Sequence, residues 1–107
     1  MLVLLDQSTP VPIRKFLRAH NVQTAFERGW DTLRNGELLN AAEEEGFEVF
    51  ITSDKNIRYQ QNLEVRRIAI IVLGSPRWPM LRLHVERVVA AVNSATPGSY
   101  REIEIPS

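Results

Sequence analysis

Two aspartates follow short apolar runs, and their positions are the strongest indication of chemistry in this sequence. Asp6 directly follows the run 2–5, and Asp54 comes two residues after the run 47–52. If both runs are parallel strands of one sheet, both carboxylates emerge at the edge where open α/β sheets bind their ligands. Carboxylate oxygens select hard cations such as Mg²⁺ and Mn²⁺. The sequence therefore predicts a carboxylate-held site for a divalent metal ion.

Two more residues complete this predicted metal site. Glu37 stands at the start of a predicted helix before the third strand and is the natural third ligand. Asn56 follows Asp54 by two residues and adds a neutral oxygen. Several carboxylates that converge at one edge repel each other unless a cation lies between them. A convergent cluster is for this reason a metal hypothesis.

Each acidic residue also has a structural explanation. Asp6 can cap a helix or accept hydrogen bonds from loop amides, and Asp54 lies in Ser-Asp-Lys-Asn, which is good turn chemistry. Glu37 can complement a helix N-terminus, an effect worth under about 1 kcal/mol. The run of three glutamates at 43–45 is typical of a solvated helix face.

The elements that must position these residues can be read from the apolar pattern. Strands are expected at 2–5, 22–26, 47–52, 68–73 and 100–105, the last as an exposed edge strand with Ile103 and Ile105 facing inward. Amphipathic helices are expected at 12–20, 36–45 and 80–93, with a turn or short helix at 53–61. Asn35 is the expected N-cap of the second helix and Gly46 its left-handed stop. The segment 74–79, which holds two prolines and a glycine, breaks regular structure.

This order of elements predicts the fold class. Strands that alternate with helices indicate a three-layer α/β/α architecture with a mostly parallel five-stranded sheet. Right-handed crossovers favour the strand order second, first, third, fourth, fifth. The switch point then falls between the first and third strands, which carry the two aspartates. Residues 1–107 are expected to form one domain.

Composition limits the classes of protein that this chain can belong to. Its 107 residues are 44% apolar and 24% charged, which are ordinary values for a globular domain. The absence of cysteine fits a reducing compartment. No apolar run approaches the roughly 20 residues of a membrane span, and Met1 leads directly into a strand, so a cytoplasmic protein without membrane contact is expected. The 13 basic and 13 acidic side chains give zero net charge, which predicts no whole-molecule attraction to nucleic acid.

Tryptophan and histidine are two further candidates for functional residues. Trp78, between Pro76 and Pro79, could stack on an RNA base, but such a tryptophan more commonly anchors a loop or a subunit contact. His20 and His84 are far apart in the sequence and lack the spacing of metal ligands, which favours core or surface roles.

Several segments together resemble a known family. They are Leu4-Leu5-Asp6, Pro12 with Arg14, Gly36-Glu37-Leu38-Leu39 with Ala42, and Ile51-Thr52-Ser53-Asp54-Lys55-Asn56. In order and spacing they are similar to the short, single-domain PIN-like proteins related to the toxins of VapC-type toxin–antitoxin pairs. In that group a first-strand aspartate, a helical acid near the position of Glu37 and a Thr-x-Asp-x-Asp or Asn signature line the active site. The resemblance covers residues 2 to 75.

The resemblance implies a metal-dependent ribonuclease. Mg²⁺ or Mn²⁺ would be held by Asp6, Glu37, Asp54 and Asn56, and would activate water for displacement at an RNA phosphodiester. Asn56 is a departure wherever the family carries a fourth acid, and this weakens the metal cage. The implied partners are RNA, an antitoxin protein and a second copy of the chain.

The resemblance also supplies candidate substrate-binding residues. Arg14 on the first helix could hold a substrate phosphate, and Lys55 is a second candidate for substrate contact. Ser8 could orient the carboxylates by hydrogen bonding.

Two other functions compete with the nuclease. A catalytically degenerate PIN-like module that acts through protein partners is favoured by Asn56 and by the neutral net charge. A phosphoacceptor receiver domain shares the size and the sheet order. It needs an acidic pair near the first strand and a lysine after the fifth, and Asp6-Gln7 and Ile105-Pro106-Ser107 supply neither.

Overall fold

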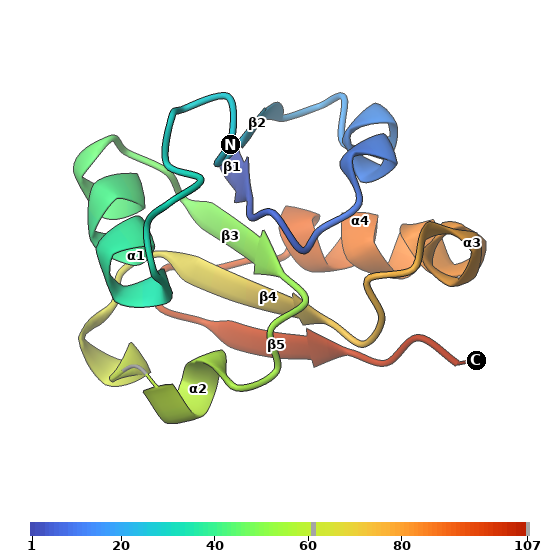
Figure 1. Cartoon of the computed structure of the whole chain (residues 1–107). Helices are drawn as coiled ribbons and strands as arrows, with labels where there is room; N and C mark the ends of the chain where they lie inside the picture. Colours follow the sequence, from blue (N-terminus) through green and yellow to red (C-terminus); the bar gives the residue numbers. More distant parts are fainter. Residues whose placement is uncertain (61, 107) are drawn as a thin grey trace.

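The core of the molecule is a sheet of five parallel strands. The strands are β1 (Leu2–Leu5), β2 (Asn21–Thr24), β3 (Val49–Thr52), β4 (Ala69–Leu73) and β5 (Tyr100–Ile103). In this computed structural model they lie in the order β2-β1-β3-β4-β5 (Figure 1). The predicted α/β class, the parallel sheet and the strand order are confirmed. Every residue of β3 and β4 is buried, which explains why these strands are continuous apolar runs.

The structure describes residues 1–60 and 62–106. Gln61, which ends the segment predicted as a turn or short helix, and Ser107, which ends the chain, lie outside the described residues. In this part of the chain no helix is long and apolar enough to cross a membrane.

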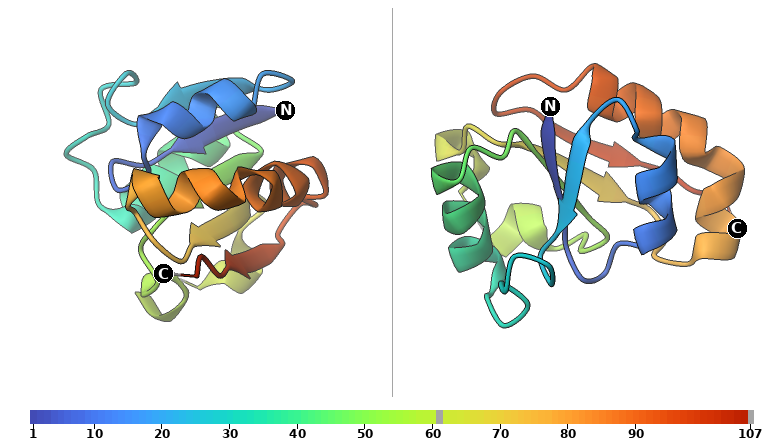
Figure 2. Two further views of the ribbon diagram at one scale, coloured as in Figure 1. Left: turned by 90° about the vertical axis from the view of Figure 1, so that its right-hand side faces the viewer. Right: turned by 90° about the horizontal axis from the view of Figure 1, so that it is seen from above.

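The helices lie on both faces of the sheet (Figure 2). Their bounds are Val11–Phe16 (the 3₁₀ helix η1), Asn35–Glu44 (α1), Ile57–Gln60 (α2), Leu63–Val65 (η2), Trp78–Leu81 (α3), Arg82–His84 (η3) and Val85–Asn93 (α4). Successive strand residues point to opposite faces. Val3 and Leu5 of β1 accordingly pack in one core cluster with side chains of η1 and α4, and Leu4 packs in another with side chains of α1.

Two predicted helices differ from the structure. The helix predicted at 12–20 is a 3₁₀ helix that ends at Phe16, where the amide of Leu17 donates to the carbonyl of Arg14 at 3.1 Å. The chain turns directly after this helix, and β2 begins at Asn21. The helix predicted at 80–93 begins earlier, at Trp78, and is divided into α3, η3 and α4. Pro79 is tolerated because it lies in the first turn of α3, where its missing N–H costs no helical hydrogen bond.

The ends of α1 show one correction and one confirmation. The prediction that Asn35 is the N-cap is wrong, because Arg34 is the N-cap and Asn35 is the first helical residue. Gly46 has φ of +82°, which confirms it as the left-handed residue after the helix. The start of α1 fixes which of its side chains face the carboxyl ends of the strands.

The sheet brings the ends of β1 and β3 together. The two strands are adjacent and parallel, with Leu5 opposite Ile51. The amide of Asp6 donates to the carbonyl of Ile51 at 3.1 Å. The loops that carry Asp6 and Asp54 therefore leave the sheet side by side.

Candidate functional site

A hollow of about 260 Å³ lies where β1 and β3 end. It is lined by Asp6, Gln7, Ser8, Ala25, Trp30, Asp31, Leu33, Asn35, Leu38 and Asp54. The structure thus brings Asp6, Ser8 and Asp54 of the predicted site to one place, at the carboxyl edge of the sheet and at its switch point. The lining combines apolar side chains with the carboxylates of Asp6, Asp31 and Asp54.

Asp6 is held by four hydrogen-bond donors. Its Oδ1 accepts from the backbone amide of Ser8 at 3.0 Å and from Ser8 Oγ at 2.7 Å. Thr9 Oγ1 lies 3.0 Å from Oδ1 and 2.9 Å from the carbonyl oxygen of Ile51, and these two acceptors share its one hydroxyl hydrogen. Its Oδ2 accepts from Thr52 Oγ1. Ser8 therefore orients the Asp6 carboxylate.

Thr52 connects the two aspartates. Its side chain is fully buried at the end of β3. The hydroxyl donates to Asp6 and accepts from the backbone amide of Asp54 at 3.0 Å. One buried hydroxyl thus fixes the position of both acidic residues relative to each other.

Asp54 combines turn chemistry with a contact across the hollow. Its Oδ1 accepts from the backbone amide of Asn56 at 2.9 Å, which is an Asx-turn. Its Oδ2 accepts from Asn35 Nδ2 at 2.8 Å. The Asn56 side chain is exposed, and Asn56 is not one of the described residues that line the hollow. The amide close to the carboxylates is that of Asn35.

Glu37 lies elsewhere. Its Oε1 accepts from the backbone amide of Arg34 at 3.4 Å, so it complements the N-terminus of α1. It is exposed and is not one of the described residues around the hollow. The reason is helical phase, because a helix turns by about 200° over two residues and Asn35 already faces Asp54.

The structure adds three residues that the site prediction missed. Asn35 was interpreted as a cap, and Trp30 and Asp31 lie in a segment with no clear periodicity. Trp30 and Asp31 reach the hollow from the loop 25–34, in which the amide of Trp30 donates to the carbonyl of Ala25 at 2.8 Å, and Asn35 reaches it from the start of α1. Within residues 1–60 and 62–106, no three His, Cys, Asp or Glu side chains form a group that could hold one metal ion. Asp6 and Asp54 would hold a cation together with waters and substrate oxygens.

Arg14 is engaged outside the hollow. Its guanidinium forms a two-point ion pair with Glu27, in which Nη1 lies 3.3 Å from Oε2 and Nη2 contacts Oε1. The hydrogen bond from Arg14, with that from the amide of Thr24, lowers the pKa of the Glu27 carboxyl from its usual 4.5. Arg14 would have to leave Glu27 to bind a phosphate. Lys55 is exposed on the turn after Asp54, beside the hollow rather than in its wall.

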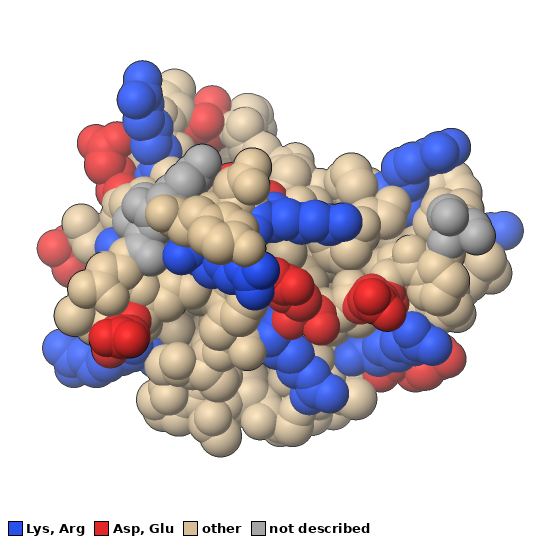
Figure 3. All heavy atoms as spheres, turned by 90° about the horizontal axis from the view of Figure 1, so that it is seen from below, with Lys and Arg blue, Asp and Glu red and all other residues tan. Residues whose placement is uncertain are grey.

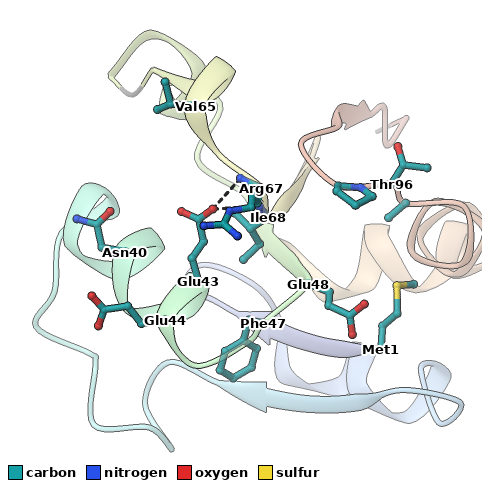
Figure 4. Close-up of a pocket in the computed structure, with 12 residues that line it drawn as sticks. Met1, Asn40, Glu43, Glu44, Phe47, Glu48, Val65, Arg67, Ile68 and Thr96 are labelled. Carbon is teal, nitrogen blue, oxygen red and sulfur yellow. Dashed lines mark hydrogen bonds between the residues drawn. The ribbon is translucent and has the colours of Figure 1, made fainter.

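A second hollow, of about 550 Å³, lies at the opposite edge of the sheet (Figure 4). It is lined by Met1, Asn40, Glu43, Glu44, Phe47, Glu48, Val65, Arg67, Ile68, Ala95, Thr96 and Pro97, so none of the described residues around it belongs to the predicted site. Glu43 accepts from Arg66 Nη1 at 2.9 Å and from the amides of Arg67 and Ile68 at 2.7 and 3.3 Å. Of the three glutamates at 43–45, Glu43 is therefore a structural ion-pair residue rather than part of a solvated face.

Trp78 is an anchor on the other face of the sheet. Its ring centroid lies 5.9 Å from that of Phe16, and it packs against the core cluster beneath η1 and α4. His20 is likewise structural, because its Nε2 lies 2.7 Å from Asn93 Oδ1 at the end of α4. Neither residue lines the hollow at the carboxyl edge.

Charges of both signs are interleaved on the face that carries α2 and β5 (Figure 3). Arg58 of α2, for example, lies 3.5 Å from Glu102 of β5. This face offers no uniformly positive track for a phosphate backbone.

Comparisons with known proteins give no relative. No protein-family model, curated protein or solved structure matches the chain.

Proposed function

We propose that this protein is a metal-dependent endoribonuclease of the PIN-like type and the toxin of a toxin–antitoxin pair. The observation that supports the proposal is the pair of aspartates, Asp6 and Asp54, that faces one hollow at the switch point of a parallel sheet. The motif order in residues 2 to 75 is the second support. RNA is the proposed substrate, and an antitoxin protein and a second copy of the chain are the proposed partners.

The donors around the hollow fit a hard divalent cation. Mg²⁺ usually leans on one or two carboxylates and keeps several waters for substrate phosphates, and Mn²⁺ accepts the same oxygen ligands. Asp6 and Asp54 would hold the ion, and Asn35, whose Nδ2 donates to Asp54 Oδ2 at 2.8 Å, would fix that carboxylate. The bound ion would supply an activated water and charge stabilisation for in-line displacement at phosphorus.

The chain's own residues have distinct roles in this proposal. Thr52 and Ser8 hold the Asp6 carboxylate in one orientation, so that it does not have to reorganise when the ion binds. Water would form a new bond to phosphorus as the P–O bond to the leaving sugar oxygen breaks, and the proton lost by the water would reach that oxygen through solvent, giving a phosphomonoester and a free hydroxyl. Glu37 stays a predicted ligand that would have to leave the amide of Arg34 to take part.

A specific observation favours the second candidate, a non-catalytic PIN-like module that binds protein partners. The described residues contain no group of three potential metal ligands, and the hydrogen bonds of Asp6 and Asp54 already serve loops and turns. In that case both aspartates act only in folding.

The experiment is a calorimetric titration of Mn²⁺ into the wild type and four variants, beside a cleavage assay on mixed RNA. Asp6→Asn and Asp54→Asn remove one carboxylate charge each and should weaken Mn²⁺ binding at least about ten-fold and abolish cleavage. Glu44→Gln removes an exposed acid at the opposite edge and should change neither. Glu37→Gln shows whether Glu37 is a metal ligand or only complements the helix N-terminus. The affinity for Mn²⁺ should fall in this variant only if Glu37 is a ligand.

The outcomes separate the two functions. Binding and cleavage that are lost together in both aspartate variants support the nuclease. Wild-type protein that binds Mn²⁺ without cutting RNA contradicts the nuclease and favours the binding module. Circular dichroism of each variant confirms that it is folded before the titration is interpreted.

A further inference from the structure

We propose that Trp30 is the residue on which an unpaired RNA base stacks, next to the aspartate pair. This inference rests on the proposed function, because it names how the substrate of that same site is held. Trp30 is half-buried and lines the hollow with Asp6 and Asp54. The base would lie against the indole while its phosphate faces the carboxylate edge.

The indole is held in a fixed position. The loop that carries it turns at Gly29, where φ is +76°, and the amide of Trp30 donates to the carbonyl of Ala25 at 2.8 Å. The ring meets Phe47 edge-on, with centroids 5.9 Å apart and planes at 69°. A ring that is already ordered loses little entropy when a ligand stacks on it.

A cation supports the same ring. The guanidinium carbon of Arg28 lies 4.8 Å from the Trp30 ring centroid, and Arg28 Nη2 is held by Glu45 Oε1 at 2.6 Å. The cation–π contact and the ion pair keep Arg28 against the indole. Trp30 also lines the hollow, so a base that enters the hollow would meet the indole there.

The chemistry of the hollow favours a base over a phosphate at this wall. Trp30, Leu33 and Leu38 are apolar residues of the lining, and Asp31 in the same lining repels a phosphate that no cation neutralises. At about 260 Å³ the hollow lies below the usual size of a pocket for a drug-sized ligand, which suits one flat ring. Every base has a π-face, but only an unpaired base exposes it for stacking.

The overall charge points to the same kind of contact. The net charge is zero, and both signs are interleaved on the face with α2 and β5 (Figure 3). Without a net positive charge, long-range attraction of a phosphate backbone to the whole molecule is weak. Stacking supplies affinity that needs no positive surface.

Trp78 provides a matched control. It is the other tryptophan of the chain, and it packs with Phe16 on the opposite face of the sheet. In the Trp78→Phe variant, indole fluorescence therefore reports Trp30 alone. Trp78→Phe itself should leave RNA affinity unchanged.

The test is a fluorescence titration with the single-stranded hexanucleotide of uridine, in Mg²⁺ buffer and again in EDTA. In Trp78→Phe protein, the RNA should quench the remaining indole emission in at least one buffer. Trp30→Leu should weaken binding by about five-fold or more, measured by anisotropy of labelled RNA, whereas Trp30→Phe should stay within about two-fold of the wild type. The same strand annealed to its complement should give no quenching.

Three results would overturn the inference. They are no binding of the hexanucleotide in either buffer, binding without quenching, and equal affinity of Trp30→Leu and the wild type. The quenching measurement uses the native indole, so it stands even if Trp30→Leu fails to fold.

The nuclease proposal fails by a different result. Binding that depends on Trp30, without metal-dependent cleavage, supports the role of Trp30 and contradicts the nuclease. Cleavage that Trp30→Leu leaves unchanged supports the nuclease and contradicts the role of Trp30.

Discussion

At the scale of single residues, hydroxyl groups determine the geometry of the aspartate pair. Ser8 and Thr52 donate to Asp6, and Thr9 shares its hydroxyl hydrogen between Asp6 and the carbonyl of Ile51. Thr9 and Thr52 are buried. A buried polar group that loses its partner costs about 1–3 kcal/mol of folding free energy. The hydroxyls therefore contribute to stability whether or not a metal ion binds at the site.

Thr52→Val tests this contribution. Valine has nearly the same shape, but it leaves the amide of Asp54 and one position on Asp6 without a partner. The free energy of unfolding should fall by about 1–3 kcal/mol in urea denaturation. Thr52→Ser keeps the hydroxyl and loses only one methyl group, worth about 0.8 kcal/mol. A larger loss in Thr52→Ser than in Thr52→Val would show that packing, and not hydrogen bonding, dominates at this position.

At the scale of elements, the points where helices and strands begin and end decide which side chains reach the hollow. The first turn of α1 directs Asn35 to Asp54 and leaves Glu37 to complement the helix terminus. The left-handed residue Gly46 then ends the helix, and β3 follows from Val49. At the end of β4, Gly74 lets the backbone after β5 approach closely.

Alanine substitutions at the two glycines should destabilise the protein for different reasons. Gly46→Ala has open space around its Cβ, so its cost is the left-handed conformation alone, about 1–2 kcal/mol. Gly74→Ala places a Cβ 2.9 Å from the carbonyl oxygen of Ile103 and from the amide nitrogen of Ile105, and both are backbone atoms. Urea denaturation should give a larger loss for Gly74→Ala. Equal losses would mean that the chain after β5 moves away freely.

At the scale of the whole molecule, ion pairs tie elements together that are far apart in the sequence. Arg66, after η2, pairs with Glu43 of α1, and Glu43 also accepts from two amides before β4. Burial raises the pKa of the Glu43 carboxyl. The hydrogen bonds from Arg66, Arg67 and Ile68 outweigh burial, so the pKa falls below its usual 4.5.

The sign of this shift predicts how stability changes with pH. A carboxyl whose pKa is lowered by folding stabilises the native state above its unfolded pKa, and the stabilisation disappears as pH falls through the folded value. Glu43→Gln should lose about 1–3 kcal/mol at neutral pH, because the two amides and Arg66 keep only a neutral partner. The difference from the wild type should shrink below a pH of about 4.5.

Thermal unfolding at several pH values measures this difference. Glu44→Gln, at the exposed neighbouring position, should stay within about 0.5 kcal/mol of the wild type. A difference between Glu43→Gln and the wild type that is constant down to pH 3 would contradict the ionic origin of the effect.

The sequence by itself determined the parallel sheet, the strand order and the position of the aspartates at the ends of β1 and β3. Continuous apolar runs and strand–helix alternation are local patterns, and crossover handedness leaves few topologies for them. Tertiary structure alone decided that Asn35, Trp30 and Asp31 line the hollow, whereas Glu37 and Asn56 do not. The direction of a side chain depends on the residue at which a helix starts and on how an aperiodic loop folds over its neighbours. Neither the first residue of a helix nor the path of such a loop produces a periodic pattern in the sequence.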